Sequence, residues 1–172
     1  LHRSHDHVHG APRTPSSVQV GWRSTLTSPL RSWGTVTEKM LSDALEKVAL
    51  EKIAPDLKIL KLIETHLDSI KMIVLRNGSL RASFFRDIWR VERVRRNFDM
   101  HEITLFKQIL VEGKEQGLFE VDNIDILADI LHYCIKGIEV PYVRGKIGEE
   151  LDDRQGWEYV AKIVYGALGH KS

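Results

Sequence analysis

From about residue 35 to residue 168, apolar side chains recur at intervals of three or four residues, and this spacing constrains the fold more than any other feature of the chain. Such a period places the apolar residues on one side of an α-helix, and that side must be buried against another element. No stretch has the regular apolar–polar alternation of a β-strand. The sequence therefore predicts an all-α body of about six helices, over residues 35–54, 56–75, 80–96, 99–117, 122–141 and 154–168.

Local signals mark the expected ends of these helices. Thr35 and Glu38 have the spacing of a capping box, in which each side chain bonds a backbone N–H of the first turn. Pro55 disfavours helical backbone at the preceding residue and suits the first turn of the next helix. Asp99 is expected to open the fourth helix, and Gly117 to close it in a left-handed conformation.

The fifth helix, capped by Asp122 or Asn123 and ended at Pro141, has the most regular apolar stripe. The stripe advances by three, four, three and four residues, which is the spacing of shallow helix–helix packing. The last helix carries its apolar residues on one side as well. The two stripes consist of Ile124, Leu127, Leu131, Cys134 and Ile138 on the fifth helix, and of Trp157, Val160, Ala161, Val164 and Leu168 on the last.

The composition changes sharply near residue 35. Residues 1–34 contain neither Lys nor Ile, have Asp6 as their one acidic residue, and hold three of the chain's five prolines. A segment with so few apolar groups in register cannot offset the entropy lost on ordering. The sequence predicts two parts: a low-order leader over residues 1–34 and a helical domain over residues 35–172.

The remaining composition narrows the class of protein. A chain of 172 residues with a net charge of +1 suits one globular domain without a strong overall field. No apolar run approaches the ~18 residues of a membrane span, and no secretory signal is visible. Cys134 is the only cysteine, which fits a cytoplasmic protein, and its place on an apolar stripe predicts a buried, structural thiol.

Catalytic patterns are missing from the sequence. It contains no Gly-rich phosphate loop, HExxH, CxxC or GxSxG motif, so we expect no enzyme, cofactor or metal site. His66, His101 and His132 are dispersed and are expected to be satisfied core or surface residues. The four histidines within residues 2–9 favour an incidental tail over a metal-binding tract, because no Cys or acidic cluster completes a site.

The predicted third helix is rich in arginine. One interpretation is a phosphate-binding surface, whose affinity would fall steeply with salt. The other is a solvated face with local ion pairs, which the spacings of Asp87–Arg90 and Glu92–Arg96 favour. The arginines concerned are Arg81, Arg86, Arg90, Arg93, Arg95 and Arg96.

The stretch from Phe106 to Phe119 resembles the end of the seventh helix in regulators of the TetR family. In that family a long helix closes with an EG…GxF pattern, which stands here as Glu112-Gly113 and Gly117-Leu118-Phe119. A short acidic turn follows, here Asp122-Asn123, and then a helix with an A…GI ending, here within residues 128–138.

The resemblance covers roughly residues 35–170 in helix order and length, and it implies a TetR-type C-terminal regulatory domain. In the family, the later helices enclose a ligand cavity and the last two form a dimeric four-helix bundle. The two apolar stripes would then line a homodimer interface. The effector would be apolar or amphipathic, although the same aromatic residues could form a plain core. The implied ligand-binding residues are Ile63, His66, Phe84, Phe85, Trp89, Phe106 and Tyr133.

The chain departs from the family where operator DNA is read. Family members have a Gly-Thr-aromatic-Tyr-x-aromatic stretch before a Ser-Lys-Glu-like cap, and here only Thr37-Glu38-Lys39 is similar. No helix-turn-helix is recognisable in residues 1–34. The implied function is a transcription regulator, with this chain as its effector-binding and homodimerising part and with DNA binding either lost or supplied by an N-terminal module not recognisable in this chain. The alternatives are a helical dimerisation module without an effector and a helical enzyme.

Overall fold

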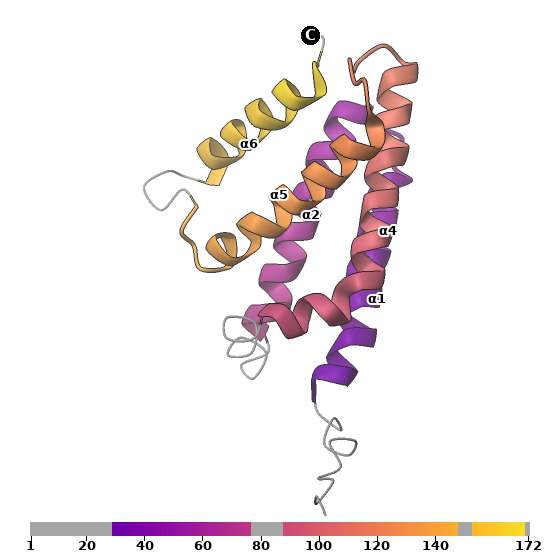
Figure 1. Ribbon diagram of the computed structural model, residues 1–172. Helices are drawn as coiled ribbons and strands as arrows, with labels where there is room; N and C mark the ends of the chain where they lie inside the picture. The colour runs from indigo at the N-terminus through magenta and orange to yellow at the C-terminus, as the bar shows by residue number, and fades with distance from the viewer. Residues whose placement is uncertain (1–28, 77–87, 148–152, 171–172) are drawn as a thin grey trace, which may run out of the picture.

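The computed structural model describes residues 29–76, 88–147 and 153–170, and for residues 29–36, 88–94 and 153–154 it describes only the helical backbone. These residues form five α-helices and no strand, which confirms the all-α prediction. The helices are α1 (Pro29–Ala49), α2 (Pro55–Arg76), α4 (Ile88–Glu115), α5 (Ile124–Val143) and α6 (Asp153–Leu168) (Figure 1).

The body is a bundle of four helices with α6 at one side. The helix α1 packs against α2 and α4, and α5 packs across α2 and α4 (Figure 1). The helix α6 packs mainly against α2. The core is one continuous cluster whose fully buried members include Leu45, Ile59, Leu62, Phe106, Leu110 and Ala128.

The predicted boundary between a third and a fourth helix is wrong. The helix α4 runs unbroken through Asp99, although its first turns lie at an angle to the rest (Figure 1). Residues 96–99 contain neither Gly nor Pro, so nothing there forces the helix to end. Asp99, expected to open a helix, instead pairs with Lys136 of α5. Residues 80–87 lie outside the described residues.

The first helix begins earlier than predicted. It opens at Pro29, six positions before Thr35, because a proline in the first turn loses no hydrogen bond. Thr35 and Glu38 therefore lie within α1, and the predicted capping box is wrong. The helical body reaches into the predicted leader as far as Pro29, and residues 1–28 of that leader lie outside the described residues.

Other predicted boundaries are confirmed. Pro55 opens α2, and the side chain of Asn123 caps α5 by accepting a hydrogen bond of 3.0 Å from the backbone N–H of Ile126. Gly117 lies beyond the end of α4 with φ of 74°. In contrast, the predicted end of the fifth helix at Pro141 is wrong, because α5 continues two residues further, to Val143.

The turn between α4 and α5 explains the Gly and Phe of the EG…GLF pattern. The backbone N–H groups of Leu118 and Phe119 both donate to the carbonyl of Gly113, at 2.9 and 3.2 Å. This folds the buried Phe119 ring onto Gly113, where a Cβ would lie 2.1 Å from two ring carbons. Glu112, the residue before, forms an ion pair of 2.9 Å with Lys58 of α2.

Among the described helices, none is both long enough and apolar enough to cross a membrane.

Candidate functional site

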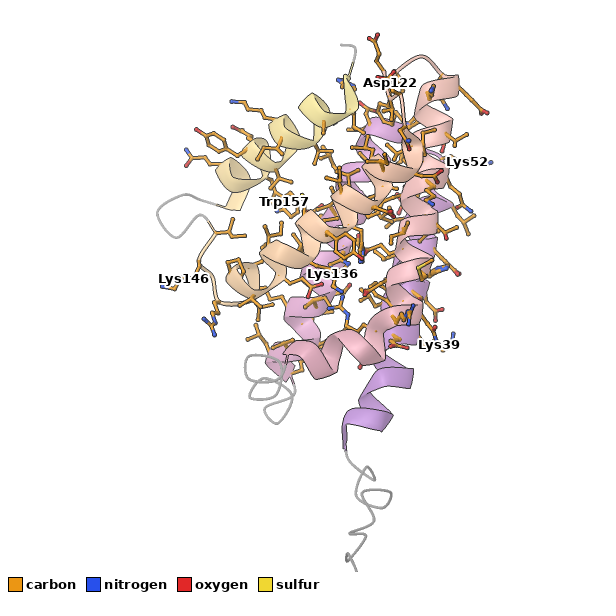
Figure 2. The ribbon with its side chains drawn as sticks, viewed as in Figure 1. Lys39, Lys52, Asp122, Lys136, Lys146 and Trp157 are labelled. Carbon is orange, nitrogen blue, oxygen red and sulfur yellow. The ribbon has the colours of Figure 1, made fainter. Side chains whose placement is uncertain are left out.

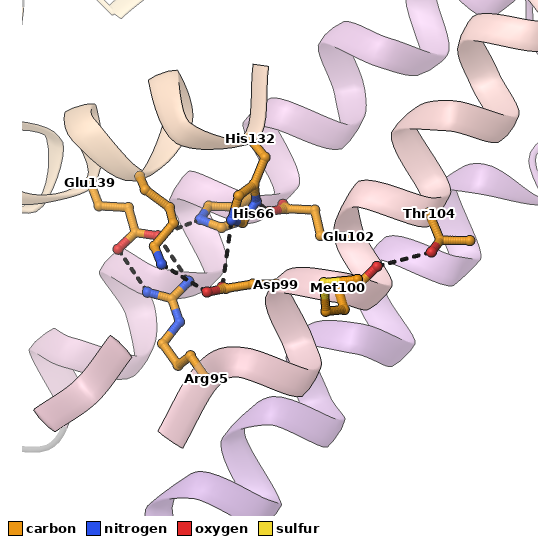
Figure 3. Close-up of polar contacts among 9 residues, drawn as sticks. His66, Arg95, Asp99, Met100, Glu102, Thr104, His132 and Glu139 are labelled. Carbon is orange, nitrogen blue, oxygen red and sulfur yellow. Dashed lines mark hydrogen bonds and ion pairs between the residues drawn. The ribbon is translucent and has the colours of Figure 1, made fainter. Parts of the chain in front are cut away.

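The interior of the bundle holds a cluster of charged side chains, which we call the ionic network (Figure 3). It lies where α2, α4 and α5 meet, and most of its members are nearly inaccessible to solvent. It consists of His66 of α2, of Arg95, Asp99 and Glu102 of α4, and of His132, Lys136 and Glu139 of α5.

His66 is the centre of the ionic network. Its Nδ1 lies 2.5 Å from Oε1 of Glu102, and its Nε2 lies 2.8 Å from Oε1 of Glu139. Arg95 donates two hydrogen bonds to Glu139, at 2.8 and 2.9 Å. His132 Nδ1 lies 2.7 Å from the second oxygen of Glu102. Each buried glutamate is therefore shared between two partners from different helices.

Helical spacing brings these side chains together. Arg95, Asp99 and Glu102 stand at i, i+4 and i+7 on α4, so they share one side of that helix. His132, Lys136 and Glu139 have the same spacing on α5. Lys136 Nζ lies 2.8 Å from Asp99, which adds a third link between α4 and α5, after Arg95–Glu139 and Glu102–His132.

The carboxylates hold His66 in its protonated form. Burial lowers the pKa of His66, but the charges and hydrogen bonds of Glu102 and Glu139 outweigh this and raise it from the usual 6.5 to about 9. Both ring nitrogens then donate a hydrogen. With no nitrogen left to accept, His66 has no free group to offer a ligand or a substrate.

The same pairing keeps the two glutamates ionised. Burial raises the pKa of Glu102, but His66 and His132 lower it from 4.5 to about 2. Burial likewise raises the pKa of Glu139, while Arg95 and His66 bring it to about 2. The charges of the protonated His66 and Arg95 thus balance those of the two glutamates, which is the condition for keeping charges inside a protein.

These pKa shifts predict how stability depends on pH. Because the pKa of His66 is raised in the folded protein, protonated His66 stabilises the fold fully below pH 6.5. This stabilisation is lost as the pH rises through about 9. Because the pKa values of Glu102 and Glu139 are lowered, the ionised carboxylates stabilise the fold fully above pH 4.5. This stabilisation is lost as the pH falls through about 2. The free energy of unfolding should be highest near pH 5–6 and fall by on the order of 3 kcal/mol by about pH 9.

Urea unfolding between pH 6 and pH 9.5 measures this fall. The variant His66→Gln should have a flatter profile over this range, whereas His101→Gln, at a partly exposed position, should keep the native slope. A native profile as flat as that of His66→Gln would show that the folded protein does not hold His66 protonated.

The structure does not assemble all of the predicted ligand-binding residues. Ile63, His66 and Phe106 are completely buried, and the ring nitrogens of His66 are engaged by the glutamates. Tyr133, predicted as a ligand-binding residue, is 66% exposed on the outer side of α5 and does not lie with the buried ones. Phe84 and Phe85 lie outside the described residues, as does the side chain of Trp89.

The predicted dimer stripes lie largely inside one copy. Leu131, Val164 and Leu168 are 6%, 5% and 0% exposed, so they belong to the core and cannot meet a second chain. The half-buried members are Ile124, Leu127, Ile138, Trp157, Val160 and Ala161. Cys134 is exposed, and its prediction as a buried thiol is wrong because it lies opposite the side of α5 that the core covers.

A second apolar stripe on each of these helices is exposed instead. Ile130 of α5 is 52% exposed and Ile163 of α6 is 73% exposed. On both helices the stripe follows the helical period, on the side turned away from the core. We call the two stripes the outer face, which consists of Ile126, Ile130, Tyr133, Cys134 and Gly137 of α5 and of Tyr159, Ile163, Gly166 and Ala167 of α6.

Sequence reasoning missed the ionic network. The expectation that His66 and His132 are satisfied core residues is confirmed, but nothing indicated that they share Glu102. Arg95, for which the sequence favours a solvated face over a phosphate-binding surface, is instead buried against Glu139. The sequence signal that could have indicated the ionic network is the set of charged residues at i, i+4 and i+7 on the core side of α5.

In the part of the chain that the structure describes, no group of three or more His, Cys, Asp or Glu side chains is placed to hold a metal ion. Comparison of the chain with protein-family models, curated proteins and solved structures finds no match.

Proposed function

We propose that this chain is the homodimerising regulatory domain of a TetR-type transcription regulator, and that α5 and α6 form a four-helix bundle with the same helices of a second copy. The observation that carries the proposal is the outer face. It exposes large apolar side chains on two neighbouring helices, and such surfaces commonly mark interaction sites.

Several features of the outer face favour a second copy as its occupant. Its two stripes share the spacing i, i+4, i+7 and i+8, so the same surface can meet itself across a two-fold axis. Gly137 and Gly166 have open space around them, which lets a facing helix approach closely. Asp129 of α5 and Lys162 of α6 border the stripes and would attract each other across such an interface.

The regulatory role rests on the resemblance of residues 106–138 to the TetR family. In this proposal an apolar or amphipathic small molecule is the effector, and operator DNA is bound through a module not recognisable in this chain. The burial of Ile63, His66 and Phe106 favours a second candidate, a dimerisation module that takes no effector. Both candidates use the same outer face.

The dimer is tested by placing a charge on the outer face. Native protein should sediment at twice the 19.8 kDa mass of one chain, and Ile163→Glu or Ile130→Glu should sediment as a folded monomer. An unpaired carboxylate in an apolar contact is costly, whereas at an exposed site in a monomer it is tolerated. Sedimentation velocity with circular dichroism measures both association and folding.

Met40→Glu is the matched control, because Met40 is 58% exposed on α1 and lies off the outer face. This variant should remain dimeric. A native chain that stays monomeric at high micromolar concentration would refute the proposal, and so would an Ile163→Glu variant that dimerises as tightly as the native chain.

A further inference from the structure

A small pocket lies on the inner side of α6. Its volume is about 40 Å³, and it opens between α2, α5 and the first half of α6. Figure 2 places Trp157 between the ribbons of α6 and α5. The lining residues are Leu67, Ile138, Tyr142, Ile147, Gly156, Trp157 and Val160.

The chemistry of the walls suits an uncharged ring. Tyr142 and Trp157 meet edge to face with ring centroids 6.5 Å apart, and Leu67 forms a buried apolar floor. The hydroxyl of Tyr142 donates a 2.5 Å hydrogen bond to Asp68, so it is already engaged. Among the described residues that line the pocket none is charged, and burying a charged ligand against them would leave its charge without a partner.

The second half of α6 is anchored firmly. Val164 and Leu168 are buried, and the carbonyl of Leu168 accepts a 2.9 Å hydrogen bond from the backbone of Glu120. His170, just beyond the helix, lies 3.2 Å from Asp56. The first half of α6 meets the body at the pocket, through the half-buried Trp157 and Val160.

The first half of α6 also carries part of the outer face. Trp157 and Val160 face the pocket, while Tyr159 is 60% exposed on the other side. A helix is close to rigid over two turns, so any displacement of the pocket side moves the outer side by the same amount.

We propose that this pocket binds a small uncharged aromatic molecule, and that its entry pivots the first half of α6 outward and weakens the dimer. A benzene ring occupies a cavity of about 150 Å³ in an engineered protein. The 40 Å³ seen here is far smaller, so a ring can enter only if α6 moves. The inference names the effector site of the proposed regulator, and its second half rests on the proposed dimer.

Binding is tested with toluene on protein labelled with 5-fluorotryptophan, using Trp157→Phe to assign one of the four tryptophan resonances. Toluene should shift the Trp157 fluorine resonance saturably, and sodium benzoate should not. Gly156→Leu fills the pocket with a better helix former and should weaken toluene binding at least tenfold. The matched control Gln155→Leu, at an exposed neighbouring position, should bind as the native protein does.

The coupling is tested by sedimentation equilibrium with saturating toluene, which should raise the dimer dissociation constant about tenfold in native protein and leave Gly156→Leu unchanged. No saturable shift at Trp157, or a shift by benzoate of equal affinity, overturns the site. Saturable binding without any change in dimerisation overturns the coupling. Toluene binding to the monomeric Ile163→Glu variant tests the pocket independently of the dimer. If the proposed dimer is wrong, the coupling is refuted, but the binding site is still tested by this measurement.

Discussion

Replacing Glu139 with Gln should lower the free energy of unfolding by about 3–5 kcal/mol, because it removes one partner of a buried ion pair. Glu139 accepts two hydrogen bonds from Arg95 and one from His66, and all three side chains are almost completely buried. Glutamine keeps the shape but not the charge. Arg95 would then be left in the core without its main counter-charge.

Urea unfolding at pH 6 measures the loss, and Glu64→Gln on the exposed side of α2 is the matched control, with an expected change within about 0.5 kcal/mol. The double variant Arg95→Met with Glu139→Gln should recover part of the stability, since the stranded charge is gone. A loss below about 1 kcal/mol for Glu139→Gln would mean that Arg95 reaches solvent or another anion.

Replacing Gly113 with Leu should cost about 3–5 kcal/mol, because the Phe119 ring must leave its buried site. A Cβ at Gly113 would lie 2.1 Å from two carbons of that ring, which is 3% exposed. The ring cannot simply slide away, since the backbone N–H groups of Leu118 and Phe119 are bonded to the carbonyl of Gly113. Leucine is a good helix former, so poor helix propensity cannot explain a loss.

Thermal and urea unfolding of Gly113→Leu give this cost, and Glu115→Leu, at an exposed position two residues later on α4, should change stability little. Adding Phe119→Ala to Gly113→Leu should restore part of the loss, because the two changes act on one contact. Equal stability of Gly113→Leu and the native protein would mean that the turn repacks without Phe119.

Features that depend on neighbouring residues can be predicted from the amino-acid sequence of this chain. The three-to-four spacing required helices, because an apolar side of a helix must be buried somewhere. Pro55, Asn123 and Gly117 marked helix ends correctly, since their effect on φ or on a cap hydrogen bond acts within one turn. The same kind of local signal gave wrong helix starts at Thr35 and Asp99. These residues can begin a helix but do not force one to begin, and a helix runs through each of them.

The side of α5 that faces the core depends instead on contacts between distant parts of the chain. The helix has apolar residues on opposite sides, Ile135 toward the core and Ile126 toward solvent, and a period of 3.6 residues describes both stripes equally well. The choice follows from His132 and Glu139, which must lie inward to meet Glu102, His66 and Arg95. Those partners are 30 to 73 positions away along the chain. The residue spacing within one helix does not indicate which distant side chains it will pair with, so these ion pairs cannot be inferred from it.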